Sequence, residues 1–466
     1  MQTSLFDLLP PNLPKPIAKI FTFVDLFAGI GGFRLPLSQL GGHCLAYAEI
    51  DREAIATYQN NWNSPELAPN LGDVSQVEQL PLNLDLVVGG VPCQAWSIAG
   101  KTLGFADPLG KLWFDVCRLI EQSQPKAFLL ENVKGLTEPR HRGSFDWILH
   151  HLRNSGYCVY WQILNSYDFG LPQDRDRLFL WGLRRDLPNC NQFKFFPPSV
   201  KPCHLYDFLE DLPNQPVKKR KFSPQLLFGN RIPASRGRFQ RSDELNDFFL
   251  FTDVRDGHTT IHSWDLMETS DRQKLICETL LKNRRKKKYG SRDGNPLNFS
   301  HLQALIPNLQ RSELKQLVDQ NIFRITADHL FDFENSKIST GINGVARIFL
   351  PHAQAIGTLT ASGTKDFIAT ATLPDAEPQE YKQNFIKSIY LPGKFRALTP
   401  QDYAKLQGFS EDFAIHPNPA IAKKQFGNAV SIPIVYHLAQ LIIQYFSLEI
   451  SARFRDPPQS PFKRGR

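Results

Sequence analysis

Between residues 21 and 183 the chain alternates short apolar segments with longer amphipathic ones, and this alternation constrains its fold more than any other feature. Two amphipathic segments, 51–62 and 111–123, predict helices. Six apolar segments rich in β-branched and aromatic residues predict strands, at 21–27, 43–48, 84–88, 127–130, 159–164 and 178–183. Because strands that alternate with helices build parallel sheets, we expect an α/β fold with a doubly wound, mostly parallel sheet.

A glycine-rich turn follows the first predicted strand, in the sequence DLFAGIGG at residues 25–32. Glycine lets the backbone approach a ligand closely at the N-terminus of the following helix. Glu49 ends the second predicted strand, where its carboxylate can accept hydrogen bonds from ribose hydroxyls. Asp73 ends a further predicted strand and is either an acceptor for an adenine amine or an ordinary turn residue. Such turns bind NAD, FAD and S-adenosylmethionine alike, and a turn without a ligand is the alternative.

A cysteine follows the third of these strands, in the sequence GGVPCQ at residues 89–94. Open α/β sheets bind ligands at the carboxyl ends of their strands, and Pro92 stiffens the turn that carries Cys93. Most cysteines are inert and buried, but this placement favours a nucleophile. A thiolate there needs a basic neighbour, a polar cleft or a helix N-terminus to lower its pKa from about 8.5. Ser97 and Lys101 follow in a loop that could close over a substrate.

Charged side chains mark two further strands. Glu131 follows the strand at 127–130, where burial can keep its carboxyl protonated and able to donate a hydrogen bond; an acid that caps the next segment is the alternative. The sequence QDRDR at 173–177 leads into the strand at 178. Arg175 and Arg177 are two residues apart and therefore point to one side, where flanking carboxylates can orient them toward a carbonyl oxygen or a phosphate. A solvated charge cluster is the alternative.

Composition narrows the class of protein. With 466 residues, 42% hydrophobic and 21% charged, the chain has the content of a soluble protein of two or more domains. It contains no uninterrupted apolar run of about 18 residues and no secretory signal, so we expect a cytoplasmic protein without a membrane partner. Seven cysteines without pairing motifs predict reduced thiols, and no spacing indicates a metal site. A net charge of +8 permits a nucleic-acid partner.

The pattern changes near residue 188. Residues 186–390 carry Pro-Pro breaks without sustained periodicity, which predicts an insertion into one discontinuous domain formed by 20–185 and 391–450. In the second part, Thr399 is predicted to cap a helix, and 429–446 is predicted to form an apolar helix. Residues 1–19 predict an N-terminal extension and 451–466 a disordered basic tail. The insertion contains a basic run that includes Arg284, Arg285, Lys286, Lys287 and Lys288.

Taken in order, these motifs resemble those of the cytosine-5 DNA methyltransferase family. DLFAGIGG is similar to the family's cofactor loop, PCQ at 92–94 to its nucleophile loop, ENV at 131–133 to its acid motif and QDRDR to its paired-arginine motif. RALTP at 396–400 and QFGNAV at 425–430 resemble its last two motifs. The resemblance covers about 20–185 and 394–446, and it implies the Rossmann-like fold of methyltransferases that depend on S-adenosylmethionine.

The resemblance also implies a covalent mechanism. Cys93 would attack carbon 6 of cytosine, while protonated Glu131 hydrogen-bonds ring nitrogen 3 and Arg177 donates to the carbonyl oxygen. Arg175 would support the loop. Carbon 5 would then take the methyl group of S-adenosylmethionine, and loss of its proton would expel Cys93.

The same resemblance assigns cofactor contacts. Phe27 would pack on the adenine, Glu49 would hold the ribose, and Asp73 would accept from the adenine amine. The other expected contacts lie in the glycine turn, in the nucleophile loop and in the returning C-terminal segment: Ala28, Gly29, Gly31, Pro92, Asn428 and Val430.

Duplex DNA is the implied substrate, with the target cytosine flipped out of the stack at a cost of a few kcal/mol. Residues 186–390 would be the target-recognition domain, with the basic run as a phosphate contact or, alternatively, a solvated loop. Ser97 and Lys101 are also expected to contact DNA, and the polar loop 358–364 to read bases. A cognate restriction endonuclease and a monomeric state complete the expectation. Three alternatives remain open: methylation of cytosine in tRNA, an NAD-dependent oxidoreductase, and a catalytically silent DNA-binding module.

Overall fold

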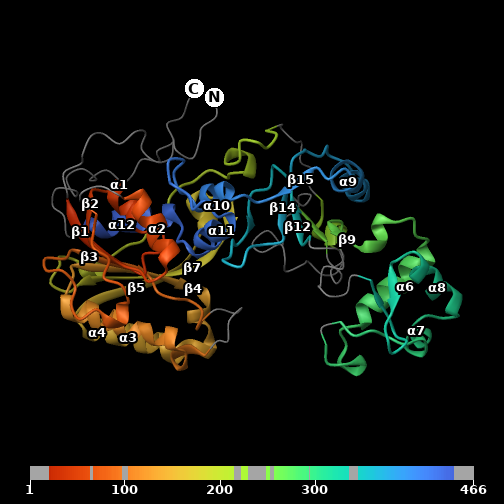
Figure 1. Cartoon of the computed structure of the whole chain (residues 1–466), viewed down its shortest axis with the longest axis horizontal. Helices are drawn as coiled ribbons and strands as arrows, with labels where there is room; N and C mark the ends of the chain where they lie inside the picture. The colour runs from red at the N-terminus through yellow and green to blue at the C-terminus, as the bar shows by residue number, and fades with distance from the viewer. Residues whose placement is uncertain are drawn as a thin grey trace. The chain divides into compact units, whose positions relative to one another are not determined.

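The computed structural model describes residues 20–62, 67–96, 103–214, 222–228, 248–251, 257–292, 294–334 and 345–445, and these divide into two compact units (Figure 1). Unit 1 comprises Met1–Leu209, Gln354–Thr364 and Thr399–Arg466, and unit 2 comprises Glu210–Ala353 and Lys365–Leu398. The units divide at other boundaries than the predicted ones. Residues 186–209 and 354–364 belong to unit 1, and 391–398 belong to unit 2. The predicted N-terminal extension and basic tail lie outside the described residues.

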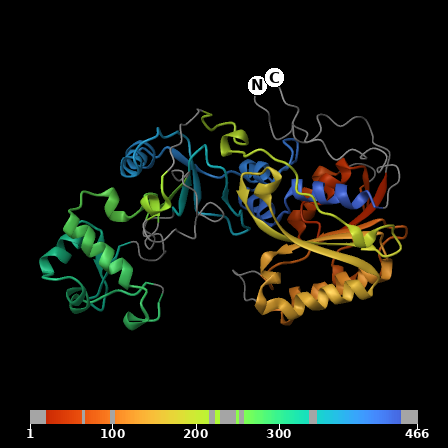
Figure 2. The ribbon, with the colours of Figure 1, turned by 180° about the vertical axis from the view of Figure 1, so that it is seen from behind.

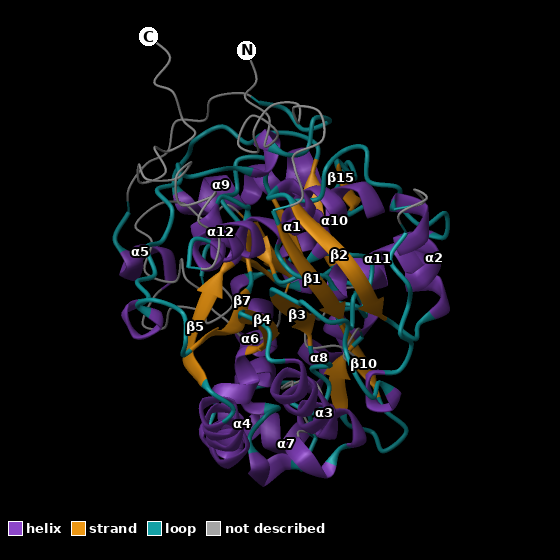
Figure 3. Cartoon of the chain, turned by 90° about the vertical axis from the view of Figure 1, so that its left-hand side faces the viewer, coloured by secondary structure: helices purple, strands orange, loops and turns teal. Residues whose placement is uncertain are grey.

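A six-stranded sheet in the order β2-β1-β3-β4-β7-β5 forms the centre of unit 1 (Figure 3). β7 pairs antiparallel with both β4 and β5, whereas the other pairings are parallel, so one strand runs against the other five. The predicted α/β class with a mostly parallel sheet is therefore confirmed. The strands are β1 (Phe21–Leu26), β2 (Gly42–Ala48), β3 (Leu86–Gly90), β4 (Ala127–Val133), β5 (Tyr157–Asn165) and β7 (Asp176–Arg184).

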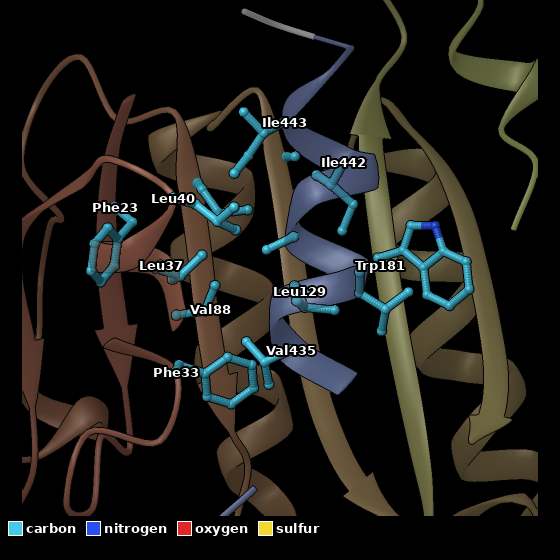
Figure 4. Packing of buried hydrophobic residues seen from close by; sticks show 14 of the residues in the cluster. Phe23, Phe33, Leu37, Leu40, Val88, Leu129, Trp181, Val435, Ile442 and Ile443 are labelled. Atoms are coloured by element: carbon cyan, nitrogen blue, oxygen red, sulfur yellow. The ribbon is translucent and has the colours of Figure 1, made fainter. Parts of the chain in front are cut away.

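Helices cover both faces of this sheet (Figures 1 and 2). Side chains alternate between the faces along a strand, so Val88 and Leu129 join one apolar core while Val87 and Phe128 join the other. The first core includes α1 (Arg34–Gln39) and α12 (Ile432–Ile443), as Figure 4 shows. The second includes α3 (Pro108–Ser123) and α4 (Arg142–Asn154). This packing leaves the carboxyl ends of the parallel strands for the loops that carry the candidate site.

Helix caps follow the local sequence. The side chain of Asp51 accepts from two backbone N–H groups at the start of α2 (Arg52–Asn61). Thr399 caps α10 (Pro400–Gln407), as predicted, with proline at the first turn. The predicted apolar helix at 429–446 is shorter, because Ala429 ends α11 (Pro419–Asn428) and α12 begins at Ile432. α4 was not predicted, although its buried residues Phe145, Ile148, Leu149 and Leu152 have helical spacing.

Within the described ranges, one helical stretch, Pro419–Ile443, is apolar and long enough to cross a membrane. Of its most apolar window, 67% is buried inside the fold. The stretch consists of α11 and α12, and the buried side chains of α12 belong to the first core, on the same face of the sheet as α1. A core helix of a globular unit passes the same test of length and composition.

Unit 2 has two apolar cores. One lies on a five-stranded sheet in the order β15-β14-β12-β8-β9 and includes residues of α9 (Pro378–Phe385). The strands are β8 (Phe248–Phe251), β9 (Thr260–Ile261), β12 (Arg347–Phe349), β14 (Asp366–Ala369) and β15 (Phe395–Ala397). The other core is mainly helical, with α6 (Asp271–Asn283), α7 (Phe299–Leu305), α8 (Arg311–Asp319) and the hairpin of β10 (Phe323–Ile325) and β11 (Phe331–Phe333).

The cysteines differ from the prediction at two of seven positions. Cys158 and Cys190 form a disulfide, so the expectation of seven thiols is wrong for this pair. The other five are free: Cys44, Cys93, Cys117, Cys203 and Cys277.

Candidate active site

Cys93 lies in the loop that follows β3. The backbone N–H of Trp96 donates to the carbonyl oxygen of Cys93 at 3.0 Å and closes a tight turn. Cys93 is partly exposed, whereas Cys44 and Cys117 are buried in the two cores of unit 1. The thiol is therefore not sealed inside packed core, and it lies at the end of the sheet where α/β proteins bind ligands.

The side chains of Glu131 and Arg177 are in contact on one face of the sheet. In the antiparallel pairing of β4 with β7, Glu131 lies opposite Phe179 and Val133 opposite Arg177, so the acid and the arginine are diagonal neighbours. Arg177 Nε lies 3.0 Å from Glu131 Oε1, and the two side chains are 15% and 12% exposed. Arg177 Nη1 also donates to the carbonyl oxygen of Asp176 at 2.8 Å. A forked donor and a carboxyl group are thus fixed side by side by strand register.

The strand β3 brings the cysteine loop to this pair. Gly90 pairs with Glu131 across the parallel ladder, three residues before Cys93. A Cβ atom built on Gly90 would lie 3.9 Å from Glu131 Oε2, so the carboxyl group is next to the start of the loop.

Burial sets the protonation of both groups. Burial raises the pKa of Cys93, and the Glu131 carboxylate raises it further, while Arg177 and Arg175 act in the opposite direction. Burial also raises the pKa of Glu131 against the effect of the same two arginines. A thiolate would need a basic neighbour to lower the pKa of Cys93; the two arginines act in that direction, but desolvation outweighs them and the net shift is upward. The expectation of a protonated Glu131 agrees with the direction of its shift.

Arg175 uses its guanidinium to hold backbone segments of unit 1 together. It is buried, and it donates to the carbonyl oxygens of Leu359 at 2.7 Å, Gly427 at 3.1 Å and Ala429 at 2.9 Å. Three carbonyls from two distant parts of the chain are thereby fixed on one side chain.

The carboxylates that flank the arginines do not orient them as expected. Asp174 and Asp176 both accept from the side-chain amide of Asn165, at 2.6 and 2.9 Å. Asp176 also pairs with Lys134 at 3.1 Å. These contacts fix the turn between β5 and β7 instead.

Residues 354–364 dock onto this turn. β13 (Ile356–Gly357) pairs with β6 (Gln173–Asp174), and the Leu359 N–H donates to the side-chain oxygen of Gln173 at 3.3 Å. A Cβ atom on Gly427 would overlap the backbone at Thr360, so only glycine permits this approach. The loop 358–364, expected to read bases in the inserted domain, therefore belongs to unit 1 and holds segments of the candidate site together.

The glycine turn and Glu49 are in direct contact. The Gly29 N–H donates to Glu49 Oε2 at 2.8 Å, and Glu49 Oε1 accepts from the N–H groups of Ile50 and Asp51, each at 2.8 Å. Phe27 adopts φ +55°, which is rare for a bulky residue and common at functional sites. A Cβ atom on Gly29 would meet nothing within 4 Å, so space for a ligand lies beside the turn.

The other expected cofactor residues have different environments. Ala28 and Val430 are buried, and a Cβ atom on Gly32 would lie 2.9 Å from Val430 Cγ1, so the C-terminal segment packs beneath the turn. Gly31 packs against the Trp62 ring, which leaves no room there for a Cβ atom. Pro92 is half-buried, and Asn428 is exposed at the end of α11.

Asp73 does not end a strand. Residue 70 makes an isolated bridge to Tyr47, and Asp73 caps the short 3₁₀ helix Val74–Gln76 by accepting from the Ser75 N–H at 2.9 Å. The expectation of a strand at this point is wrong, since one bridge is all that pairs here within the described part of the chain.

Three contributors to the site were not predicted. Asn132 is buried and donates to the carbonyl oxygen of Val91 at 3.1 Å, which fastens the cysteine loop to β4. Trp96 is buried, and its ring packs edge-on against Phe105 and His141. Ile50 is 68% exposed beside Glu49 and offers an apolar surface at the glycine turn. Asn132 lies within the recognised ENV motif, but no sequence pattern indicated its partner.

The residues expected to bind DNA divide into three groups. Ser97 and Lys101 lie outside the described residues. Arg284 is buried and pairs with Asp332, so its expected contact with DNA is wrong. The next four basic residues are exposed: Arg285, Lys286, Lys287 and Lys288. Among the described residues, no group of His, Cys, Asp and Glu could hold a metal ion.

Comparisons with known proteins agree with this geometry. The family model of the C-5 cytosine-specific DNA methylases matches residues 21–444. The type II methyltransferase M.HgiBI of Herpetosiphon aurantiacus is 43% identical over 92% of this chain and 99% of the relative, and M.HgiCII of the same organism is 44% identical over 91% and 97%. The type II methyltransferase M.BanI of Aneurinibacillus aneurinilyticus is 31% identical over 91% and 95%. This chain therefore belongs to the C-5 cytosine-specific DNA methylases and is a DNA (cytosine-5) methyltransferase.

Proposed function

We propose that the chain transfers a methyl group from S-adenosylmethionine to carbon 5 of a flipped cytosine within a specific short sequence of duplex DNA, through a covalent bond to Cys93. The observation that carries the proposal is the arrangement of the Cys93 loop beside the Glu131–Arg177 pair. A nucleophile, an acid and a forked donor lie on adjacent strands, as attack on a pyrimidine ring requires.

Each of these residues has one role in the proposed reaction. Burial raises the pKa of the Cys93 thiol, so Sγ gives its proton to water as it bonds to carbon 6, and the electron pair of the 5,6 double bond moves toward carbon 5 and ring nitrogen 3. Burial raises the pKa of Glu131, which favours the protonated carboxyl that the proposal needs as a donor to ring nitrogen 3, and Arg177 donates to the carbonyl oxygen. Carbon 5 would then bond to the methyl group that bound S-adenosylmethionine supplies, with the thioether as the leaving group. Water takes the proton from carbon 5, the electron pair of that bond re-forms the 5,6 double bond, and the bond between carbon 6 and Sγ breaks to release the Cys93 thiolate.

The residues around the glycine turn suit S-adenosylmethionine. When bound, this cofactor supplies an electrophilic methyl group on a sulfonium. Glu49 is placed to accept from the ribose hydroxyls, and Phe27 and Ile50 offer apolar surfaces for the adenine. The open space at Gly29 leaves room for the methionine part of the cofactor. Asp73 stays a candidate acceptor for the adenine amine, since its cap uses one carboxylate oxygen.

The relatives support a place in restriction–modification. M.HgiBI, M.HgiCII and M.BanI are named type II methyltransferases, and such an enzyme protects DNA from an endonuclease of the same specificity. We therefore propose a cognate endonuclease, a cytoplasmic location with access to the chromosome, and a working monomer. Unit 2 is the proposed target-recognition part.

Methylation in a host that lacks cytosine methylation tests this function. Expression of the chain should place 5-methylcytosine at one recurring sequence, while Cys93→Ala, as the matched control, should leave the DNA unmethylated. Purified enzyme should also label unmethylated duplex DNA with the donor's methyl group and leave tRNA unlabelled. Label in tRNA alone would reject duplex DNA as the substrate.

A further inference from the structure

A strongly basic loop in unit 2 is held by buried polar side chains. We define the basic loop as residues 285–292, which follow α6. Five of its eight side chains are cationic and exposed, and no acidic residue interrupts them: Arg285, Lys286, Lys287, Lys288 and Arg292. The Lys288 ammonium lies 4.6 Å from the centre of the Tyr289 ring, so one cation also has an aromatic neighbour within the loop.

The buried side chain of Asn295 ties the two ends of the basic loop together. Its amide nitrogen donates to the carbonyl oxygens of Arg284 at 3.0 Å and Arg292 at 2.9 Å, and its oxygen accepts from the Arg292 N–H at 3.1 Å. The Asn295 N–H also donates to the Arg284 carbonyl at 2.7 Å. Four hydrogen bonds from one residue therefore fix the backbone on both sides of the lysines.

Arg284 forms the base of the same support. Its guanidinium pairs with Asp332 at 3.0 Å, and the two side chains are 4% and 5% exposed. It also lies over the Phe333 ring at 5.3 Å. Gly294, at φ +111°, packs so closely on this guanidinium that a Cβ atom would lie 2.6 Å from Nη2. Gly290 packs in the same way against the Asn295 amide.

A solvated charged loop needs none of this structure. Burying an arginine and a carboxylate carries a desolvation cost, and apolar side chains of similar volume often stabilise a core as well or better. The buried pair of Arg284 and Asp332 is therefore better explained by the position that it gives the loop than by stability. Here the buried groups hold the backbone on both sides of Lys286, Lys287 and Lys288, whose side chains are exposed. Positioned lysines are compact point charges that suit phosphate oxygens and carry no base specificity.

We propose that the basic loop binds the phosphate backbone of duplex DNA, with Lys286, Lys287 and Lys288 as its contacts. The proposal rests on the proposed function: the loop would suit the phosphates of any polyanion, and we choose duplex DNA because it is the proposed substrate. The loop would add affinity and salt dependence, without reading the sequence.

Salt dependence of DNA binding tests the proposal directly. Each phosphate contact contributes about 0.9 to the slope of log K against log salt, so the triple variant Lys286→Gln, Lys287→Gln, Lys288→Gln should reduce the slope by up to about 2.7. The matched control is Lys274→Gln, Lys282→Gln, Lys315→Gln, which removes the same charge from α6 and α8 of the same core. The control should keep the wild-type slope.

A second variant separates position from charge. Asn295→Ala keeps every cation but removes the three side-chain hydrogen bonds to Arg284 and Arg292 that order the loop, so DNA affinity should fall several-fold while the protein stays folded. Circular dichroism and methylation at saturating DNA and low salt check the fold.

Equal slopes for the wild type, the lysine triple and its control would overturn the proposal. So would a triple variant that loses affinity for tRNA while its binding to duplex DNA is unchanged. Either result would leave the catalytic proposal intact if the variants still methylate duplex DNA at low salt. Failure of the wild type to methylate DNA would instead reject the proposed function.

Discussion

The cysteine loop of unit 1 and the basic loop of unit 2 are both held by a buried asparagine, but in different settings. Asn132 makes one hydrogen bond to the cysteine loop, at the Val91 carbonyl, because β3 and β4 already position that loop. Asn295 lies outside a strand, where the segment after it joins β11 only by the isolated bridge of Leu297 with Phe331, and it supplies four hydrogen bonds itself, three of them from its side chain. The comparison indicates that a sheet positions chemistry through register, whereas outside a sheet buried polar side chains must do so.

The largest effect is expected at the nucleophile. Cys93→Ala should lower kcat by at least about 10⁴-fold, since the covalent route is lost and the remaining groups cannot replace it. Binding of S-adenosylmethionine and of duplex DNA should persist in the folded variant. Quenched-flow methylation and separate titrations of the two ligands measure this; a variant that keeps wild-type turnover would exclude Cys93 as the nucleophile.

Glu131→Gln should lower kcat by about 10²- to 10³-fold, because an amide donates to ring nitrogen 3 without transferring a proton. Cys93→Ala and Glu131→Gln should differ in one respect: the Gln variant can still form some covalent complex. A kcat within twofold of the wild type would show that the acid is not needed.

The raised pKa of Glu131 also predicts a pH dependence of stability. The folded state holds this proton more tightly than the unfolded state, so the associated stability is present in acid and is lost as pH rises through the folded pKa. Relative to the wild type, Glu131→Gln should therefore become more stable as pH rises from mildly acidic to alkaline. Urea unfolding across that range measures the difference, and an opposite trend would contradict a raised pKa.

In unit 2, Arg284→Met tests whether the buried ion pair is structural. Removing Arg284 leaves the buried Asp332 with Arg324 at 3.4 Å and the Phe333 N–H at 2.9 Å as partners. The loss in the free energy of unfolding should therefore stay below the value of about 3–5 kcal/mol expected for an unpaired buried charge. Because Arg284 supports the backbone of the basic loop and makes no DNA contact of its own, DNA affinity should fall no further than in Asn295→Ala. A variant that keeps the wild-type free energy of unfolding but loses DNA affinity would return Arg284 to the DNA surface.

The smallest effect is expected for Asn132→Ala, which is the sheet counterpart of Asn295→Ala. The Val91 carbonyl would lose its donor at a cost of about 1–3 kcal/mol. Because the strands still hold the loop, kcat should fall by only about tenfold, with DNA affinity unchanged. Loss of DNA affinity with normal kcat would reverse the assignment of the two asparagines.

The same contrast explains what the sequence could predict. The strands, the glycine turn with Glu49 and the positions of Cys93 and Glu131 follow from local patterns, because residues at strand ends converge in any doubly wound sheet. Arg175 could not be assigned in this way, since its partners at 359, 427 and 429 lie far along the chain. Arg284 was misassigned because a basic run does not reveal which member turns inward to Asp332.

Trapping of the covalent intermediate tests the central claim most directly. Duplex genomic fragments in which cytosine is replaced by 5-fluorocytosine block the final loss of the substituent at carbon 5. With S-adenosylmethionine present, the wild-type enzyme should form a denaturation-resistant complex, and peptide mapping should place the modified pyrimidine on Cys93. An enzyme that methylates ordinary duplex DNA but forms no such complex, or forms it at another residue, would contradict the account.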